Sequence, residues 1–395
     1  MASNYDPLAD RDDGNCKYAF ATDETKAAFA ENYAVIAHAM YQDAYTQSEA
    51  LRELIYSFVA NPTIPGLQAC KDAWVIAHIP YSQAEVLQFP GSPVRSSGSA
   101  ILQERINAWN FTPAHIDYVK DSLEAGIINQ VSKYPQIDAA LLQGLNNTVD
   151  GKRITLGYHA IEFLLWGEDK DPADELTVGK RTFKDYDTSD TNVVHAARRG
   201  QYLKLCADQL TNDLASLVNA WSPLGGSNYL KTFQAHSAKK QTRLAITGLV
   251  LFGQYELGEN RLLTTLTGLN PEREESTFSD NTQRDVFFNI LGLNSIFRGR
   301  YGMSDSTYIE GASLYDVIAE QDSSSAKQLD VLMRNVLNAS KEVTSPYDHQ
   351  VSLEQAAGVG PITDLTIALE AFGERLTEVA SALNMGIQKD LPLDE

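Results

Sequence analysis

Cysteine is scarce in this sequence, and its three cysteines form no recognisable pattern. Cys16, Cys70 and Cys206 lie far apart, and no Cys-x-x-Cys pair occurs. Zinc clusters and disulfide frameworks need several cysteines at close or regular spacing. The sequence therefore indicates neither kind of scaffold, and it leaves the redox compartment open.

Long uncharged apolar runs are also missing. Hydrophobic residues make up 43% of the chain, which is enough for a globular core. No run approaches the roughly 18 apolar residues that a membrane-spanning helix needs. The first residues, Met1 to Tyr5, lack the basic and apolar segments of a secretion signal. Either the protein is cytoplasmic or a signal has been removed, and composition alone does not decide between the two.

Basic residues are outnumbered by acidic ones. The 395 residues include 32 Lys and Arg against 52 Asp and Glu, a formal net charge of −20. Such a balance repels phosphate backbones and anionic lipid surfaces and attracts cations. Nucleic acid is therefore not an expected partner. A solvated acidic surface that maintains solubility is the simpler explanation of the charge, ahead of a cation-collecting role.

The motifs of common enzyme classes are absent as well. The sequence contains no HExxH, GxSxG, GxxxxGK[ST] or GxGxxG, so the usual hydrolase and nucleotide sites have no support. It also has no convincing runs of alternating β-branched residues bounded by hairpin turns, which argues against a sheet of any size.

Helical periodicity is what the sequence does have. Apolar residues recur at spacings of three and four, which predicts amphipathic helices. The first long helix is expected to begin near Thr22, with Thr22 or Asp23 as its N-cap. The pattern is clearest in three sets: Phe29, Tyr33, Ile36 and Met40; Leu203, Leu210, Leu214, Leu217 and Trp221; and Leu365, Leu369, Phe372, Leu376, Val379 and Leu383. We expect an all-α fold of antiparallel helix bundles.

The length of the chain exceeds a single ordinary core and suggests two domains. Residues 1–21 are rich in Asp, Gly and Asn and lack periodicity, which is typical of a flexible N-terminal arm. Residues 171–192 are polar and are the best candidate for an interdomain loop. We therefore expect one helical bundle over residues 22–170 and a second over residues 193–395.

The sharpest chemical signal is the pair His159 and Glu162 in the segment GYHAIEFLLWG, residues 157–167. On a helix, side chains three residues apart can converge on one point, as in the Glu-x-x-His pairs of metal-binding bundles, here in reverse order. An imidazole with a carboxylate suits iron or zinc. Two ligands are not a complete site, because a stable centre needs three or four. From the spacing alone, a buried hydrogen-bonded pair is the simpler interpretation.

Other polar residues also have structural interpretations. Glu256 and Glu259 stand three residues apart, and Arg261 lies close enough to form an ion-pair network with them. Ser279 or Asp280 can cap the apolar helix that follows.

In the first half of the chain, His78 and Glu85 fall on one helical stripe, where Pro80 either kinks the helix or opens a new one. Taken alone, His78 is expected to be an ordinary surface or core histidine.

Several segments together resemble the imelysin family of bacterial proteins. They are GYHAIEFLLWGED at 157–169, RRGQYLKLCADQLTNDLASLVNAW at 198–221, and FSDNTQRDVFFNILGLNSIFRGRYG at 278–302. The GxHxxE motif, the helix with paired arginines, a Gly-Glu-Leu-x-Gly-Glu-Arg type segment and a Ser-Asp-Asn-Thr segment all have counterparts here. The third carries an additional residue, Asn260, and two histidines and a cysteine common around the fourth are replaced. The segment from Trp74 to Glu85 is similar more faintly, so the resemblance covers most of the chain beyond residue 20.

The resemblance implies two similar four-helix bundles packed against each other, with a site at their interface near the GxHxxE helix. It implies iron uptake by a periplasmic or membrane-anchored protein, whose signal segment is absent from this chain. The partners would be a metal ion or iron-bearing ligand and other iron-uptake components of the cell envelope. The expected metal ligands for iron or zinc are His159, Glu162 and Glu85. The other expected site residues are Gly157, Glu256, Glu259, Ser279, Asp280 and Asn281.

Three functions remain to be distinguished. The favoured hypothesis is a non-catalytic binding protein that holds a metal or metal-bearing ligand. The second is a zinc metallopeptidase, although HxxE lacks the general base that HExxH supplies. The third is a scaffold whose polar residues form a buried hydrogen-bond network without metal. A ring nitrogen of His159 that lies vacant among converging groups would favour the binding protein over the scaffold.

Overall fold

The computed structural model describes residues 23–95, 102–109, 112–147, 153–169, 178–268 and 274–387. The predicted arm at residues 1–21, the N-cap candidate Thr22 and part of the predicted loop at 171–192 lie outside these residues. No described helix is both long and apolar enough to cross a membrane.

The described chain is mostly helical and has almost no strands, in agreement with the predicted all-α fold. Up to the middle of the chain the elements are α1 (Asp23–Ala60), α2 (Ile64–Ala84), η1 (Glu85–Leu87), α3 (Leu102–Ile106), η2 (Pro113–His115), α4 (Gly126–Asn129), α5 (Ala139–Leu145), α6 (Tyr158–Trp166), η3 (Phe183–Tyr186) and α7 (Ala196–Trp221). The remaining elements are α8 (Tyr229–Ala235), α9 (Ala238–Val250), η4 (Leu251–Leu263), α10 (Thr264–Thr267), α11 (Thr282–Arg298), β1 (Arg300–Gly302), β2 (Tyr308–Glu310), α12 (Leu314–Gln321), α13 (Ser323–Glu342), α14 (Tyr347–Ala357) and α15 (Pro361–Ala382).

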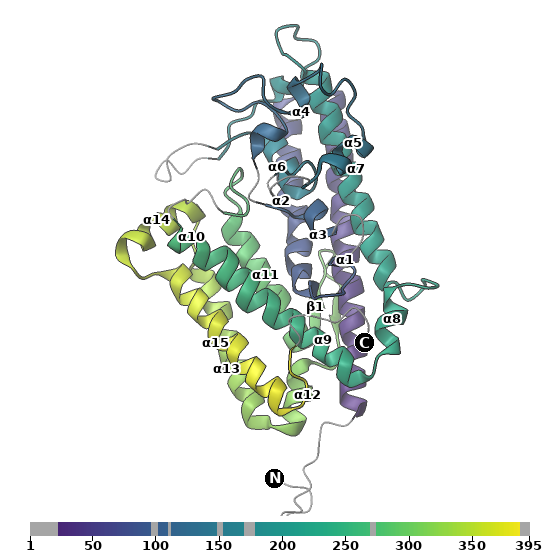
Figure 1. The fold of residues 1–395 in the computed structure, drawn as a ribbon, viewed down its shortest axis with the longest axis vertical. Helices are drawn as coiled ribbons and strands as arrows, with labels where there is room; N and C mark the ends of the chain where they lie inside the picture. The colour runs from purple at the N-terminus through teal and green to yellow at the C-terminus, as the bar shows by residue number, and fades with distance from the viewer. Residues whose placement is uncertain are drawn as a thin grey trace, which may run out of the picture.

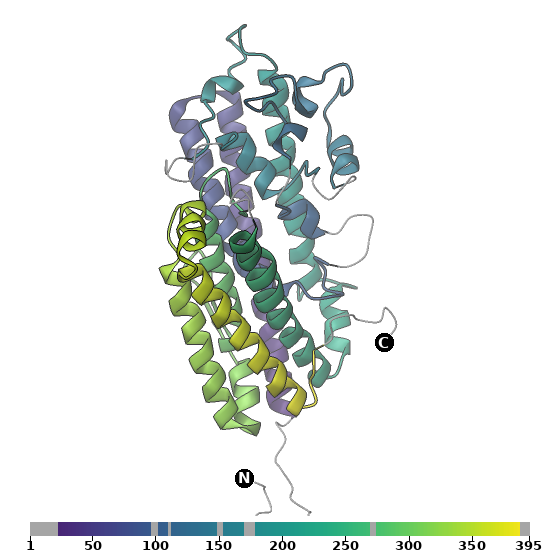
Figure 2. The same cartoon turned by 60° about the vertical axis from the view of Figure 1, so that its left-hand side comes forward.

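The helices form two groups that lie side by side (Figure 1). In the first group α1 packs lengthwise on α2 and α7, and α6 lies against α2 and α7. In the second group α15 packs on α13 and η4, and α11 packs on α13 (Figure 2). The contacts of α11 with α2 and of α9 with α1 join the groups. Because α7 follows the polar segment 171–192 and packs on α1, the first group draws on helices from both sides of that segment.

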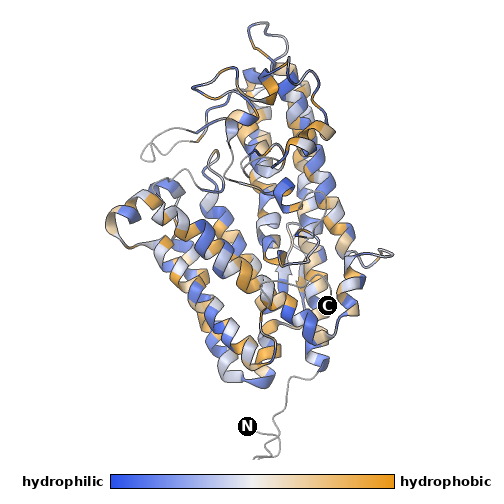
Figure 3. Ribbon diagram, viewed as in Figure 1, coloured by the Kyte–Doolittle hydropathy of each residue, from blue (hydrophilic) through white to orange (hydrophobic). Residues whose placement is uncertain are grey.

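Amphipathic patterning explains why these helices pack. Apolar and polar positions alternate around each helix in the hydropathy-coloured ribbon (Figure 3). On α1 the predicted stripe of Phe29, Tyr33, Ile36 and Met40 is at most 2% exposed. Burying apolar side chains of this size stabilises the fold by roughly 1.5–3 kcal/mol each. The two short strands β1 and β2 pair antiparallel as a ribbon beside α11 and make the only named sheet of the described residues.

Local sequence determines how α2 ends beside the site. The helix begins at an N-cap, Thr63, whose side chain accepts a hydrogen bond from the Gly66 amide. It runs through Pro80, so this residue neither opens a new helix nor ends the old one. The chain then tightens into the 3₁₀ turn η1, which places Glu85 at the junction with 1% of its surface exposed.

The segments α9, η4 and α10 form one continuous helical run in which η4 is a π-helix. At the end of η4 the Thr264 amide donates to the Glu259 carbonyl, five residues earlier. A π-turn takes up one more residue than an α-turn, and such turns occur frequently at functional sites. Asn260 and Arg261 both lie within η4. The wider turns therefore belong to the segment that carries Arg261.

Candidate metal centre

Three buried side chains from distant parts of the chain converge where the two helix groups meet. His78 comes from α2, His159 from α6, and Glu275 from the loop before α11. One ligand atom from each lies within 4.8 Å of the other two, and all three residues are buried. Within the described ranges no other set of three His, Cys, Asp or Glu side chains meets this geometry.

His159 presents one occupied and one vacant ring nitrogen. Its Nδ1 lies 2.7 Å from Glu162 Oε2, a hydrogen bond between neighbours on one helical turn. Among the described residues its buried Nε2 has no hydrogen-bond partner, and the carboxylate oxygen Glu275 Oε1 is 3.9 Å away. That distance is too long for a hydrogen bond. Since the bond at Nδ1 fixes the ring, Nε2 is the nitrogen that points toward the other groups.

Glu162 was predicted to be a metal ligand, but both of its oxygens are engaged elsewhere. Oε2 holds His159, while Oε1 accepts hydrogen bonds from the amides of Phe278 (3.1 Å) and Ser279 (2.9 Å). The Ser279 hydroxyl donates to the same oxygen at 2.7 Å. The Glu162 carboxylate thus orients the imidazole through its Nδ1, as carboxylates do for metal-bound histidines.

His78 is held by a chain of polar side chains. Its Nδ1 lies 2.8 Å from Asp285 Oδ1, and its Nε2 lies 2.8 Å from Asn107 Oδ1. Asp285 is itself fixed by the Ser276 hydroxyl at 2.5 Å. Trp74 stacks on the imidazole, with ring centroids 5.0 Å apart. His78 is therefore a core histidine, one of the two alternatives expected from the sequence, and both of its ring nitrogens are held by polar side chains.

Arg261 neutralises the carboxylates on the other side of the centre. Its guanidinium donates to Glu275 Oε2 at 2.6 Å and to both oxygens of Glu85 at 3.1 and 2.9 Å. Glu85, predicted to be a metal ligand, is therefore bound to an arginine. The remaining oxygen of Glu275, Oε1, accepts a hydrogen bond from Asn107 Nδ2 at 2.9 Å and faces the histidines.

Charges in the centre balance one another. Burial disfavours the cationic form of His159, but the hydrogen bond to Glu162 and the charge of Glu275 outweigh it and raise its pKa to about 10. Burial would raise the pKa of Glu275, but Arg261 and the two histidines hold it below the usual range. A buried imidazolium beside a carboxylate is a site that a divalent cation can occupy in exchange for the proton.

The other predicted site residues are partly brought together. Gly157 is the N-cap of α6, with φ of 95°, and it packs against the main chain of Ile106. Glu256 accepts from Arg261 at 3.2 Å and so touches the rim of the centre. Glu259 is exposed and makes no contact with the three converging groups.

The predicted capping role of the loop before α11 is wrong. The N-cap of α11 is Asn281, because Asp280 adopts the left-handed conformation (φ of 53°) and the helix begins only at Thr282. Ser279 instead donates to Glu162, and the Asn281 amide donates to Asp285 at 2.8 Å. Ser279 and Asn281 therefore support the two histidines through their carboxylate partners.

Sequence reasoning missed Glu275, Asn107, Asp285 and the bridging role of Arg261. A partial signal existed for His78, which stands four residues after Trp74 on the same helical face and so could be placed beside a buried aromatic ring. Glu275 is one of two adjacent glutamates, Glu274 and Glu275, before the Ser-Asp-Asn-Thr segment. No local spacing connects it with the histidines.

Comparison with known proteins supports this fold and identifies the family of the chain. The sequence profile of the imelysin family matches residues 37–375, and the chain belongs to this family. The chain is 23% identical over 366 residues to iron-regulated protein A of Synechococcus elongatus, an alignment that covers 91% of this chain and 85% of that protein. The predicted family and the all-α fold are both confirmed.

Two solved structures share the architecture. An iron-regulated protein A precursor from Parabacteroides distasonis superposes with a TM-score of 0.69 at 16% identity, covering 92% of this chain and 96% of that one. An imelysin-like protein from Psychrobacter arcticum gives a TM-score of 0.63 at 13% identity, covering 94% and 98%. At these identities the likeness concerns the fold alone, and function has to be argued from the site.

Proposed function

We propose that this protein binds a transition-metal ion, with iron as the physiological candidate and zinc as the alternative, through His78, His159 and Glu275. Two imidazoles and one carboxylate are the ligand set of mononuclear non-haem Fe(II) sites, and zinc accepts the same donors. Binding would not be catalytic: the metal, or a ligand that carries it, would be the cargo of the protein.

The vacant Nε2 of His159 is the observation that carries this proposal. A purely structural network would satisfy both ring nitrogens, since buried polar atoms almost always have a partner. Here Nε2 is buried, has no partner within the described part of the chain, and lies close to a second imidazole and a carboxylate oxygen. That arrangement favours a binding site over a metal-free scaffold.

Asn107 and Arg261 would set how the ion enters. Asn107 Oδ1 is hydrogen-bonded to His78 Nε2. The Asn107 side chain would therefore have to turn away or coordinate the ion through this oxygen. Arg261 holds Glu275 by Oε2 and leaves Oε1 directed at the histidines. The arginine thereby stabilises the carboxylate as an anion, which is the form that binds metal.

The proposed biological setting rests on the names of two relatives. One relative is an iron-regulated protein A, and a structural neighbour is a precursor of such a protein. We therefore propose a role in bacterial iron uptake at the cell envelope, periplasmic or membrane-anchored, in contact with other uptake components.

The metallopeptidase alternative would use His159 and Glu162 as zinc ligands and another carboxylate as the general base. Both oxygens of Glu162 are engaged, one by His159 and the other by two backbone amides, which does not favour Glu162 as a zinc ligand.

Calorimetric titration of metal-stripped protein with Fe(II) and Zn(II), under anaerobic conditions for iron, tests the proposal. We expect saturable binding that weakens by at least about tenfold in His159→Ala and in the conservative variant Glu275→Gln. His236→Ala serves as the control, because this partly exposed histidine at the end of α8 is not one of the converging groups. Circular dichroism verifies that each variant is folded.

Two results would contradict the proposal. One is wild-type protein that binds neither ion, and the other is equal affinity in the wild type and both site variants. Metal-dependent cleavage of an unfolded protein substrate that disappears in Glu275→Gln would instead support the peptidase.

A further inference from the structure

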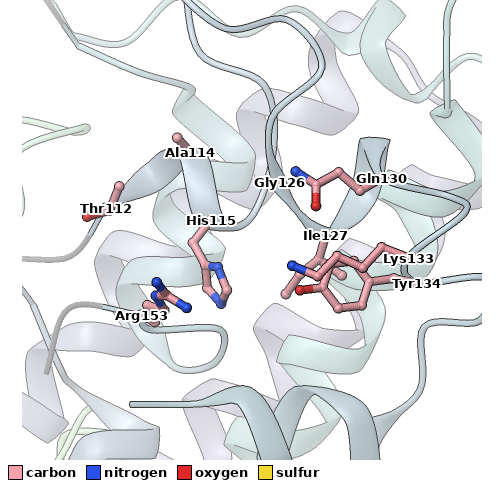
Figure 4. Close-up of a pocket in the computed structure, with 9 residues that line it drawn as sticks. All are labelled: Thr112, Ala114, His115, Gly126, Ile127, Gln130, Lys133, Tyr134 and Arg153. Atoms are coloured by element: carbon pink, nitrogen blue, oxygen red, sulfur yellow. The ribbon is translucent and has the colours of Figure 1, made fainter. Parts of the chain in front are cut away.

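A pocket of about 340 Å³ lies beside η2 and α4 and shares no residue with the metal centre. It is formed by two short segments, residues 112–115 on one side and residues 126–134 on the other (Figure 4). The lining residues are Thr112, Ala114, His115, Gly126, Ile127, Gln130, Lys133, Tyr134 and Arg153. None of them is acidic, although the chain carries a net charge of −20.

The two walls are fixed to each other at the base of the pocket. The Ile128 amide donates to the Ile116 carbonyl at 3.1 Å. Gly126 has φ of 87°, and a Cβ there would lie 2.4 Å from the backbone of Ile116 and Asp117. Only glycine fits such a close approach in this conformation. The spacing between the walls is therefore set by the backbone and not by mobile side chains.

The paired arginines at the start of α7 hold one wall each. The Arg198 guanidinium donates to four main-chain carbonyls of the second wall and its continuation, those of Ile127, Ile128, Tyr134 and Pro135. Arg199 donates to both oxygens of Asp117, at 2.6 and 3.1 Å, directly after the first wall. A preorganised frame of this kind lowers the entropy lost on binding a ligand.

Two cations line the pocket, one from each side. Among the described residues, neither Arg153 nor Lys133 forms an ion pair or a side-chain hydrogen bond, and both side chains are exposed. The Lys133 ammonium lies 5.0 Å from the Tyr134 ring, which keeps it near the pocket. In Figure 4 the His115 ring and the Arg153 guanidinium lie together on one side, and Lys133, Tyr134 and Gln130 face them from the other.

We propose that this pocket binds a small, multiply charged oxyanion that bears carboxylate or phosphate groups. A guanidinium pairs with two oxygens of such a group, and an ammonium on the opposite wall pairs with a second charge. Thr112, Gln130 and Tyr134 add hydrogen-bond donors for the remaining oxygens. The volume admits a small molecule, and the acidic remainder of the surface disfavours a large polyanion. The site adds an organic or inorganic anion to the ligands of the protein, independently of the metal.

Titration calorimetry of metal-stripped protein with citrate in one arm and inorganic phosphate in the other tests this proposal. We expect saturable binding of at least one anion, weakened by at least about tenfold in the double variant Lys133→Gln, Arg153→Gln. The matched control is Lys239→Gln, Lys327→Gln, which removes the same charge from exposed positions on α9 and α13. Because the affected side chains are exposed, both double variants should keep the wild-type melting temperature.

The two arms and the control decide the outcome. Binding that is weakened only in the pocket variant supports the proposal, and the anion that binds more tightly identifies carboxylate or phosphate as the preferred group. The same affinity in His159→Ala would show that the anion does not bind through the metal centre. The proposal is overturned if the wild type binds neither anion, or if the pocket variant and the control variant bind equally.

Discussion

Replacement of Arg261 by methionine should destabilise the protein more than almost any surface change. The Arg261 side chain is 5% exposed, and its guanidinium neutralises Glu85 and Glu275, whose side chains are 0% and 2% exposed. Methionine has a similar unbranched reach but no charge, so both carboxylates would be left buried without a cation. Breaking a buried ion pair from one side costs roughly 3–5 kcal/mol. Since two carboxylates lose the same partner, we expect about 4–5 kcal/mol.

That free energy translates into a moderate shift of the melting temperature in a chain of this size. The entropy of unfolding is about 2.1 cal/mol/K per residue, or about 0.8 kcal/mol/K for 395 residues. The expected decrease in Tm is therefore about 5–6 °C, measured by circular dichroism at neutral pH. Arg334→Met is the control, because Arg334 is 58% exposed in its 3.0 Å contact with Asp330. An exposed pair contributes less than about 1 kcal/mol.

A third variant separates lost charge balance from lost packing. Adding Glu85→Gln and Glu275→Gln to Arg261→Met removes the unpaired charges while keeping the side-chain shapes, so stability should recover in part. The reasoning would be refuted if Arg261→Met melted at the same temperature as Arg334→Met. It would be refuted equally if the two glutamine substitutions lowered the Tm of Arg261→Met further.

Two other changes test the surroundings of the centre. Burial and the nearby carboxylates of Asp169 and Asp348 raise the pKa of Asp280 to about 7, so folding favours its protonated form. This contribution to stability is complete below the unfolded pKa of roughly 3.9 and is lost as pH rises through about 7. Asparagine tolerates the left-handed φ of 53°, so Asp280→Asn should melt at a higher temperature than the wild type, by a margin that grows from pH 5 to pH 8. A difference in Tm that is equal at all pH values would contradict this. Gly157→Ala should lower stability by at least about 2 kcal/mol in urea unfolding, because φ is 95° and a Cβ would lie 2.6 Å from the Ile106 carbonyl. A variant as stable as the wild type would show that the loop can move away.

The helices were predictable because their information is local. The stripe of Phe29, Tyr33, Ile36 and Met40 identifies one face of α1 from spacing alone, and the same face is buried. His159 and Glu162 were predictable as neighbours for the same reason, and they lie 2.7 Å apart. Their roles were not, because whether Glu162 faces a metal or supports the ring depends on the amides of residues 278 and 279, which arrive from another helix group.

The convergence of His78, His159 and Glu275 could not be predicted from spacing. Each sits in a segment that has an adequate structural explanation alone: a histidine beside a buried Trp74, a hydrogen-bonded histidine, and a glutamate in a polar loop. Only the packing of α2 against α6 and α11 brings them together. Family resemblance predicted Glu85 as a metal ligand, and in the structure both oxygens of Glu85 accept hydrogen bonds from Arg261.

The position of Arg261 depends on the wider turns of η4. A π-turn takes up one more residue than an α-turn, so it changes which residues face one side of the helix. Within η4 Arg261 is directed at Glu85 and Glu275, and Thr265 in the following α10 is buried against Tyr347, with hydroxyls 3.0 Å apart. Helices are predicted from apolar residues that recur with the α-helical period, and that period does not describe a π-helix. The role of Arg261 as the counterion of two buried carboxylates therefore could not be predicted from the spacing of residues in this segment.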